Sequence, residues 1–329
     1  MIQRQKQRTG ILLTNLGTPD EPTPSAVRRY LAEFLSDQRV IEKPAWLWKP
    51  ILYGVILNVR PKKAAKSYQK VWTENGSPLL SISSQQVQQL QNLLDPKQQT
   101  VFVELAMRYG KPSISHAMHA LKKHDVDRII VLPMYPQYSA TTTASTYDAV
   151  NAVIKKWRDI PSIDFLGAYY QHPDYIRVLA DSVKHYRDAH GKSDKLLMSF
   201  HGLPQAYIKA GDPYQKQCLK TASLLAEKLN LHDDEWICAF QSRFGVEQWI
   251  KPYTDKTLEQ WAQDGLESVD IICPGFPADC LETLEEMAME NRDIFLQAGG
   301  KSYHYIECLN DQPDHIEFLA ELLKMKVSF

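Results

Sequence analysis

The chain has 329 residues, of which 44% are hydrophobic and 23% charged, a composition typical of a globular protein with a sizeable core. This length predicts one large or two medium α/β domains. The formal net charge of -1 lacks the basic excess that usually accompanies nucleic-acid binding, so we expect no nucleic-acid partner.

The N-terminal region begins with basic residues and an apolar stretch, Ile11–Leu13, too short for the core of a signal peptide. The sequence GILLTNL at 10–16 predicts a short buried strand. The most apolar later stretch, 45–59, is short and broken by Lys49 and Pro50, so we expect no membrane-spanning helix. Five cysteines without a C-x-x-C pair favour a reducing cytoplasm over a disulfide framework.

Further strands and helices follow in alternation along the chain. RIIVLPM at 128–134 and KLLMSF at 195–200 have the character of short buried strands, whereas LQNLL at 90–94 and YIRVLADSV at 175–183 have helical spacing. Such alternation predicts parallel sheets with helices on both faces.

Three segments of the first half resemble three of the second half in the same order. The pairs are LLTNLGTP with LLMSFHGLP, VFVELAMRYGKPSI with WICAFQSRFGVEQWI, and IIVLPMYPQYSATT with IICPGFPADCLETL. We therefore predict two similar Rossmann-like domains, each a parallel sheet flanked by helices, with a ligand in a cleft at the carboxyl ends of the strands. The expected halves are 1–135 plus 305–329, with an insertion at 20–77, and 136–304.

The insertion contains an apolar, Trp-rich stretch, Trp46–Leu57. It is interpreted either as a lip for a flat apolar ligand, as a peripheral membrane contact, or as a helix packed into its own core.

The stretch SFHGLP places His201 where a buried strand ends in a Gly/Pro turn. A neutral imidazole beside a carboxylate suits a divalent metal such as ferrous iron, and it equally suits proton abstraction. A structural histidine at a strand end is the alternative.

The stretch ADCLETLEEMAMENR predicts a helix, with Asp279 and Glu282 as a candidate capping box. Glu282, Glu286 and Glu290 have i, i+4, i+8 spacing and form one ridge, which can pass protons or hydrated cations. An exposed acidic face is the alternative. His201 and Glu282 both follow strands of the second half, so they could face the same cleft.

Other polar and aromatic residues also fall at predicted strand ends. Aromatic side chains could cover a planar ligand and Arg108 could meet a carboxylate, although core packing and a salt bridge are the alternatives. These residues are Asn15, Arg108, Tyr109, Tyr135 and Phe276.

Several of these stretches together resemble ferrochelatase, the family that inserts ferrous iron into protoporphyrin. They are LLTNLGTPDEP, SYQKVWTENGSPL, MRYGKPSI, LPMYPQYSATTT, SFHGLPQAYIKAGDPY and CPGFPADCLETLEE. The resemblance implies a porphyrin cleft between two domains, with His201 and Glu282 as the catalytic pair and iron site. It also implies that Glu286 and Glu290 continue an acidic ladder that begins in a widened helical turn. The resemblance implies Arg108, Tyr109 and Phe276 as cleft-lining residues, and Tyr68 and Ser77 as porphyrin contacts in the inserted lip. With the strand-end residues Asn15 and Tyr135 they form the expected porphyrin-binding set.

The sequence departs from the family at two places. Cys280 stands where many relatives have histidine, which leaves the role of this position open. No cysteine follows Cys308, and Ala140 occupies the place of an internal cluster ligand, so we expect no [2Fe-2S] cluster and no other cofactor.

The expected activity is that of a metal-inserting lyase, which makes protohaem from protoporphyrin IX and Fe²⁺ with release of two protons, at the last step of haem synthesis. A coproporphyrin ferrochelatase, a cobalt or nickel chelatase and a non-enzymatic tetrapyrrole carrier are the alternatives. We expect a cytoplasmic monomer, with Trp46–Leu57 as the candidate membrane contact.

Overall fold

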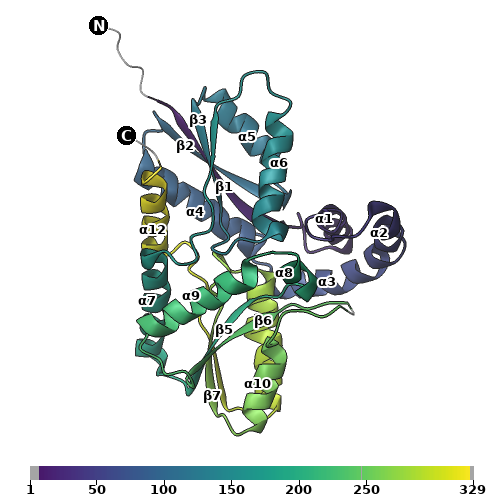
Figure 1. The fold of residues 1–329 in the computed structure, drawn as a ribbon, viewed down its shortest axis with the longest axis vertical. Helices are drawn as coiled ribbons and strands as arrows, with labels where there is room; N and C mark the ends of the chain where they lie inside the picture. The colour runs from purple at the N-terminus through teal and green to yellow at the C-terminus, as the bar shows by residue number, and fades with distance from the viewer. Residues whose placement is uncertain (1–6, 246, 327–329) are drawn as a thin grey trace. The chain divides into compact units, whose positions relative to one another are not determined.

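The computed structural model describes residues 7–245 and 247–326, which form two compact units (Figure 1). Each unit has its own four-stranded parallel sheet flanked by helices, as the sequence predicts. Within the described part, unit 1 comprises residues 7–135, 140–167 and 311–326, and unit 2 comprises 136–139 and 168–310, apart from residue 246.

The sheet of unit 1 has the strand order β2-β1-β3-β4. Ile11, Leu12 and Leu13 of β1 are fully buried, because helices cover both faces of the sheet. A strand buried on both faces is apolar throughout and does not alternate apolar with polar residues. The strands are β1 (Thr9–Thr18), β2 (Val101–Gly110), β3 (Arg128–Pro133) and β4 (Ser162–Phe165).

The helices of unit 1 include two short π-helical segments. The start of α1 shows a common helix N-cap. The hydroxyl of Thr23 accepts a hydrogen bond from the N–H of Ala26, and Pro24 is the first residue of the helix. The helices are α1 (Pro24–Phe34), α2 (Ala45–Ile51), η1 (Leu52–Ile56), α3 (Leu57–Val71), α4 (Pro78–Leu94), α5 (Ile114–Lys123), η2 (Ala140–Ala144), α6 (Ser145–Ile154) and α12 (Pro313–Lys324).

The sheet of unit 2 has the order β6-β5-β7-β8, and its core gathers around Leu197, Ile271 and Phe295. Its strands are β5 (Lys195–His201), β6 (Trp236–Gln241), β7 (Ser268–Ile272) and β8 (Ser302–Tyr305). Its helices are α7 (Pro173–His190), α8 (Gln205–Lys209), α9 (Tyr214–Lys228), α10 (Thr254–Gln263), η3 (Glu282–Asn291) and α11 (Arg292–Gln297).

The two units share one topology, as the sequence repeat predicts. In chain order, the first strand of each unit is central, the second lies at one edge, and the third and fourth extend the other side. The turns after the second strands also match: the N–H of Met107 donates to Pro112 O at 2.6 Å, and that of Phe240 donates to Pro252 O at 2.9 Å.

The boundaries between the units differ from the expected halves, 1–135 plus 305–329 and 136–304. Residues 140–167 belong to unit 1 because β4 pairs with β3 and completes the first sheet. Residues 305–310 belong to unit 2 because β8 pairs with β7, and Asn310 is hydrogen-bonded to Asp279.

The insertion at 20–77 folds into α1, α2, η1 and α3. Leu35, Ile41, Leu52 and Leu57 form a small core within it, so part of the apolar stretch is packed internally. Its outer side chains remain exposed, including Trp46 at 78% and Val55 at 60%. Among residues 7–245 and 247–326, no helix has the length and apolar character needed to cross a membrane.

Candidate functional site

His201 is the last residue of β5, at the carboxyl edge of the second sheet. The next residue, Gly202, donates its N–H to Gln241 O at 2.8 Å, and a Cβ at this position would lie only 2.7 Å from that oxygen. Glycine therefore allows β5 and β6 to stay close directly after the histidine.

The imidazole of His201 is held in one orientation. Its Nδ1 lies 2.7 Å from Gly202 O. A carbonyl oxygen can only accept, so Nδ1 carries the proton in this contact. In the neutral ring, Nε2 then keeps its lone pair, which can accept a proton or bind a metal ion.

Glu282 begins η3, a π-helical segment, as the widened helical turn in the sequence resemblance predicts. The capping box expected from Asp279 and Glu282 is not formed. Asp279 is buried and accepts hydrogen bonds from Thr283, Tyr305 and Asn310, at 2.6–2.8 Å. These bonds tie the start of η3 to the loop after β8.

Glu286 is the most constrained carboxylate of the ridge. It accepts the backbone N–H of Ser242 at 2.7 Å and also the Ser242 hydroxyl. Burial raises the pKa of Glu286; the bonds from Ser242 and the nearby His201 oppose this rise, while Glu282 adds to it. The net pKa is above the ordinary value for glutamate, so Glu286 holds a proton more readily than an exposed carboxylate does.

Two further side chains contact Glu282, one at its backbone and one at its carboxylate. The side chain of Gln241 donates to the backbone carbonyl oxygen of Glu282 at 2.8 Å, while its own side-chain oxygen accepts from Ser199 at 2.7 Å. The thiol of Cys280 hydrogen-bonds the Glu282 side chain. The pKa of this thiol is raised, mainly by burial and in addition by the negative charge of Glu282. Cys280 is thus a neutral donor that orients Glu282.

The three glutamates of the ridge differ in exposure. Glu282 and Glu286 are half-buried, and Glu290 is exposed. The ridge therefore leads from the neighbourhood of His201 to solvent. In the described part of the chain, no group of three or more His, Cys, Asp and Glu side chains has an arrangement that could hold a metal ion.

Arg108, which we expected to meet a ligand carboxylate, is ion-paired within unit 1. Its guanidinium lies 2.5 Å from Asp37, and it also donates to the hydroxyl of Ser145 at 2.6 Å. The phenol of Tyr109 donates to the same Asp37 oxygen at 2.8 Å. Burial favours the neutral form of Asp37, but the bonds from Ser145, the Arg39 backbone and Tyr109, together with the charge of Arg108, lower its pKa. The salt-bridge alternative is thus what the structure shows.

The remaining expected binding residues lie in both units. In unit 1, Asn15 donates to Ser83 at 3.3 Å, and the buried Ser77 hydroxyl accepts from Thr18 at 2.8 Å. Tyr68 is buried on α3, while the hydroxyl of Tyr135 is buried without a hydrogen-bond partner among the described residues. In unit 2, Phe276 is half-buried against the core.

Comparison with known proteins decides the family. A family model described as Ferrochelatase matches residues 8–327. The chain belongs to the ferrochelatase family. It is 52% identical over 319 residues to ferrochelatase of Thioalkalivibrio sulfidiphilus, covering 97% of this chain and 86% of that protein. It is 53% identical over 316 residues to ferrochelatase 1 of Shewanella oneidensis, covering 96% of this chain and 95% of that protein.

A solved structure supports the fold of this ferrochelatase-family chain. SirB from Bacillus subtilis with Fe³⁺ superposes with a TM-score of 0.55 at 11% sequence identity, covering 98% of this chain and 96% of that chain. Similarity at this level of identity concerns the fold alone.

The sequence patterns do not reveal three residues that bond the candidate site residues. Gln241 ends β6 and Ser242 follows it, and the repeat marks this strand end without showing which side chains bond the glutamates. Asp37 lies 71 residues before Arg108, so no local spacing relates them.

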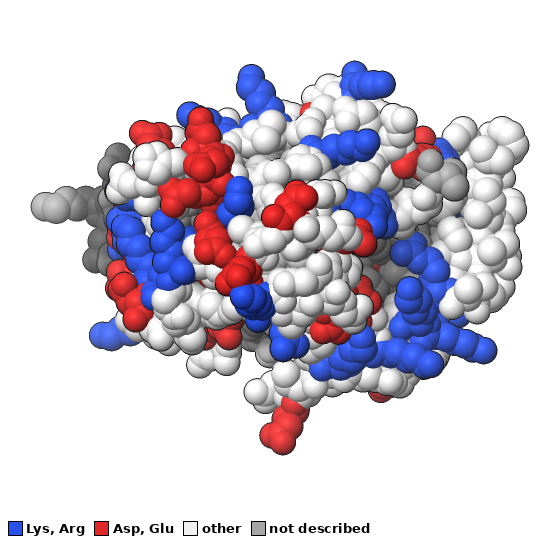
Figure 2. Space-filling view, turned by 90° about the horizontal axis from the view of Figure 1, so that it is seen from below, with Lys and Arg blue, Asp and Glu red and all other residues white. Residues whose placement is uncertain are grey.

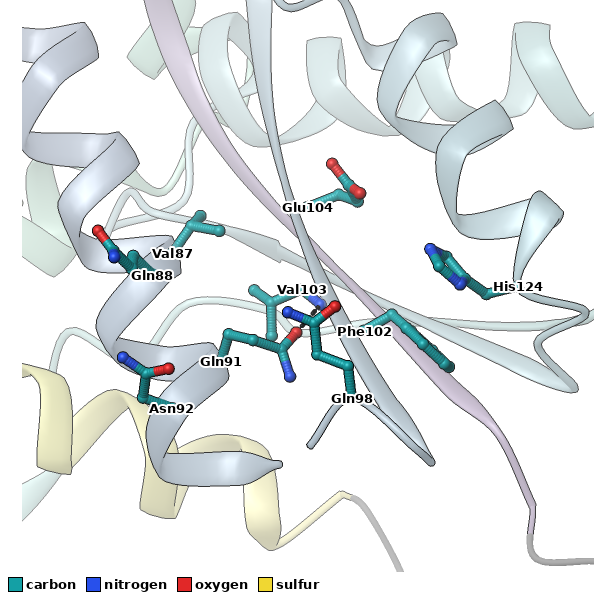
Figure 3. A pocket seen from close by; sticks show the side chains of 9 residues that line it. All are labelled: Val87, Gln88, Gln91, Asn92, Gln98, Phe102, Val103, Glu104 and His124. Carbon is teal, nitrogen blue, oxygen red and sulfur yellow. Dashed lines mark hydrogen bonds between the residues drawn. The ribbon is translucent and has the colours of Figure 1, made fainter. Parts of the chain in front are cut away.

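A separate cavity of about 320 Å³ lies in unit 1, away from the expected site residues (Figure 3). There Gln91 of α4 donates to Val101 O at 3.0 Å and accepts the N–H of Val103 at 2.8 Å. The side-chain amide of Gln91 thus satisfies backbone groups of the edge strand β2, which indicates that Gln91 has a structural role in the lining of this cavity.

Proposed function

We propose that this ferrochelatase-family chain inserts Fe²⁺ into protoporphyrin IX, with release of two protons, as the last step of haem synthesis. The observation that carries the proposal is the grouping of His201, Glu282 and Glu286 at the carboxyl edge of the second sheet. An imidazole with a lone pair beside carboxylates can accept protons, and one imidazole with one carboxylate suits the transient binding of a divalent ion.

Metal insertion requires that two pyrrole N–H protons leave and that the nitrogen lone pairs point at the ion. In the proposed mechanism the macrocycle lies over His201, whose Nε2 accepts a pyrrole proton. Glu286, with its raised pKa, can take a proton from this neighbourhood, and the exposed Glu290 passes it to solvent. Bending of the ring on binding would expose the lone pairs, using binding energy from contacts remote from the centre.

Iron is a substrate in this scheme, and His201 with Glu282 would be its transient ligands. Two protein ligands leave coordination positions for water and then for the ring nitrogens. The contact of the Glu282 carboxylate with the Cys280 thiol supports this role, because ligands held by hydrogen bonds need little rearrangement. Gln241 bonds the backbone carbonyl of Glu282 and so fixes the start of η3.

Five of the proposed porphyrin contacts come from the family resemblance, and Asn15 and Tyr135 come from their places at strand ends. Among the seven residues, Arg108 must first rearrange to bind a propionate of the porphyrin, because its guanidinium is ion-paired with Asp37. The hydroxyl of Tyr135 has no hydrogen-bond partner among the described residues but is buried, so a polar ligand atom reaches it only after a rearrangement. The proposed set is Asn15, Tyr68, Ser77, Arg108, Tyr109, Tyr135 and Phe276.

The test is anaerobic turnover of protoporphyrin with ferrous iron, followed by absorbance. We expect His201→Ala and Glu282→Ala to lose at least about a hundredfold in rate while they still bind porphyrin, because each removes a general base or ligand. Full turnover of His201→Ala would refute both proposed roles of the histidine.

The same assay separates the competing substrates. The apolar insertion favours protoporphyrin over coproporphyrin, which carries four carboxylates instead of two. Turnover of coproporphyrin alone would reassign the substrate. Binding of porphyrin without metal insertion at stoichiometric protein would indicate a carrier, and a preference for cobalt or nickel would indicate a related chelatase.

We also propose that the chain acts without a resident cofactor or cluster, as a cytoplasmic monomer. All five cysteines are buried, and burial raises their pKa values, which disfavours the thiolates that an iron–sulfur cluster needs. Iron and sulfide analysis of the purified protein tests this directly.

A peripheral membrane contact through Trp46–Leu57 completes the proposal. The exposed Trp46 and Val55 support it, because isolated apolar side chains of this size gain by entering a lipid interface. Loss of vesicle binding in Trp46→Ser is the expected result.

A further inference from the structure

The π-helical segment η3 changes its spacing near its C-terminal end. A π-helix bonds each carbonyl to the N–H five residues ahead, and an α-helix to the N–H four residues ahead. η3 ends at Asn291, and the N–H of the next residue, Arg292, donates to Met289 O, only three residues back. Carbonyls at such a change of spacing can lack a partner within the helix and are then open to other donors.

Two side chains donate to carbonyls in this stretch. The phenol of Tyr303, on β8, donates to Met287 O at 2.7 Å. The side-chain amide of Asn291 donates to Glu286 O at 2.8 Å. Both carbonyls lie on the segment that joins Glu286 to Glu290, so the two bonds hold the backbone that carries these carboxylates.

The hydroxyl of Tyr303 is not needed to fill the core. Tyr303 is buried in the apolar core that also contains Met287 and Phe295. A buried hydroxyl costs free energy unless it is hydrogen-bonded, so phenylalanine would serve the packing equally well. Burial raises the pKa of Tyr303 well above its ordinary value, and the nearby Cys273 and Glu286 add to this rise. The phenol therefore stays protonated and remains a donor to Met287 O.

The side chain of Asn291 is only partly satisfied. Asn291 is buried, and its Oδ1 has no hydrogen-bond partner among residues 7–245 and 247–326. A buried oxygen without a partner destabilises a fold. Leucine, which has nearly the same shape, would avoid this loss but could not donate a hydrogen bond. The asparagine is thus explained by its donation to Glu286 O.

Glu286 depends on such support more than a surface acid does. Figure 2 shows acidic side chains spread among basic ones on one face of the molecule. Glu286 is instead half-buried, and its carboxylate accepts from the N–H and the hydroxyl of Ser242, at the end of β6. These bonds keep their geometry only while the backbone of η3 stays in place.

We propose that Tyr303 and Asn291 are positioning residues, which keep η3 in its wide form and so place Glu286 for proton transfer. If the wide turn closed to α-helical spacing, it would lose one residue, and the side chains after it would turn by about 100° relative to those before it. Glu286 and Glu290 would then no longer form one path from His201 to solvent. The proposal rests on the proposed function and adds two residues that act through Glu286.

The first experiment removes the donor of Tyr303 with little change in the size of the ring. Tyr303→Phe and Tyr303→4-fluorophenylalanine lack the donor, whereas Tyr303→4-aminophenylalanine keeps an N–H at the same place. The matched control is Tyr253→Phe, because the phenol of Tyr253 also donates to a backbone carbonyl, Trp249 O at 3.4 Å, but outside η3. Steady-state insertion of ferrous iron into protoporphyrin is measured anaerobically for each variant.

We expect the two variants without a donor to lose about tenfold in kcat, with KM for porphyrin unchanged, because a misplaced proton-transfer group slows the chemical step. The amino variant should regain most of the rate, and Tyr253→Phe should behave as the native chain. A native kcat in Tyr303→Phe, or a failure of the amino group to restore the rate, would overturn the role of Tyr303.

Asn291→Leu separates positioning from folding. The variant removes both the donor and the unsatisfied oxygen, so its midpoint of urea unfolding should be no lower than that of the native chain. Its kcat should nevertheless fall by about tenfold, as in Tyr303→Phe. A fall in stability with unchanged kcat would show that Asn291 only supports the fold.

Hydrogen exchange of the η3 amides distinguishes a failure of this inference from a failure of the proposed function. Amides 286–292 should exchange about fivefold faster in Tyr303→Phe and Asn291→Leu than in the native chain, but not in Tyr253→Phe. Unchanged exchange in a chain that inserts iron refutes the positioning proposal alone. A native chain that inserts no iron refutes the proposed function, and exchange alone then decides whether the two donors hold η3.

Discussion

Ser242 gives a sharp prediction because its hydroxyl bonds the carboxylate of Glu286 and does not belong to the proposed catalytic groups. The change Ser242→Ala removes this bond but keeps the backbone N–H that donates to the same carboxylate at 2.7 Å. Burial already raises the pKa of Glu286, and the hydroxyl is the largest influence that opposes the rise. The variant should therefore bind a proton at Glu286 more tightly than the native chain.

The size of the effect follows from the type of bond. A hydrogen bond to a charged group contributes about 1.5 kcal/mol or somewhat more in a half-buried site. A loss of about 1.4 kcal/mol corresponds to a tenfold increase in proton affinity. We therefore expect the acid limb of the rate profile to move upward by about one pH unit, with less change in the maximal rate.

The assay is the pH dependence of anaerobic iron insertion, compared with that of Ser242→Gly. Ser242 has a φ of 63°, a left-handed conformation that glycine adopts more easily than alanine. Both variants lack the hydroxyl, so both acid limbs should move equally, while the glycine variant should be the more stable. An unmoved limb in both variants would refute the role of Ser242, and a shift in the alanine variant alone would indicate backbone strain.

Three further predictions concern stability, each measured by urea unfolding. Asp37→Asn should cost about 3 kcal/mol because it leaves Arg108 without its carboxylate in a largely buried pair, whereas Asp148→Asn, in an exposed pair with Arg39, should cost less than about 1 kcal/mol. Glu286→Gln should be more stable than the native chain at pH 8, and the difference should shrink on acidification, because a raised pKa means that the folded state gains stability as the carboxyl is protonated. Burial tends to raise the pKa of Asp95, but hydrogen bonds from the backbone N–H groups of Thr100 and its neighbours outweigh this effect and lower the pKa to about 2. The destabilisation by Asp95→Ala should therefore be full above pH 4 and disappear as the pH falls towards 2; a loss that does not depend on pH would contradict this reasoning.

The strands that the sequence predicts well are those with continuous apolar character. β1, β3 and β5 are central, their residues are buried on both faces, and this leaves a strong signal. β4 has the sequence SIDF, is only partly buried and lies at an edge. Because of this weak pattern, the sequence does not assign residues 140–167 to the first unit.

The site residues show a similar limit. His201 and the glutamate ridge are recognisable because their residue types and spacing already carry chemistry. The bond from Ser242 to Glu286 and the pair of Asp37 with Arg108 join residues 44 and 71 positions apart, and only the folded chain brings them together. The expected capping box failed for the same reason, because Asn310 supplies the partner of the Asp279 N–H.

The matched π-helical segments bear on the ancestry of the chain. Aligning Tyr135–Pro136 with Phe276–Pro277 places Thr141 opposite Glu282 and Ser145 opposite Glu286. Both segments follow the third strand of their unit, η2 after β3 and η3 after β7. A duplicated ancestor would have carried the same groups twice, so the two copies have since diverged. In the first unit the hydroxyl of Ser145, directly after η2, bonds the ion pair of Arg108 and Asp37. In the second unit the matching position is the acid Glu286, so the two once-equivalent places now have different roles.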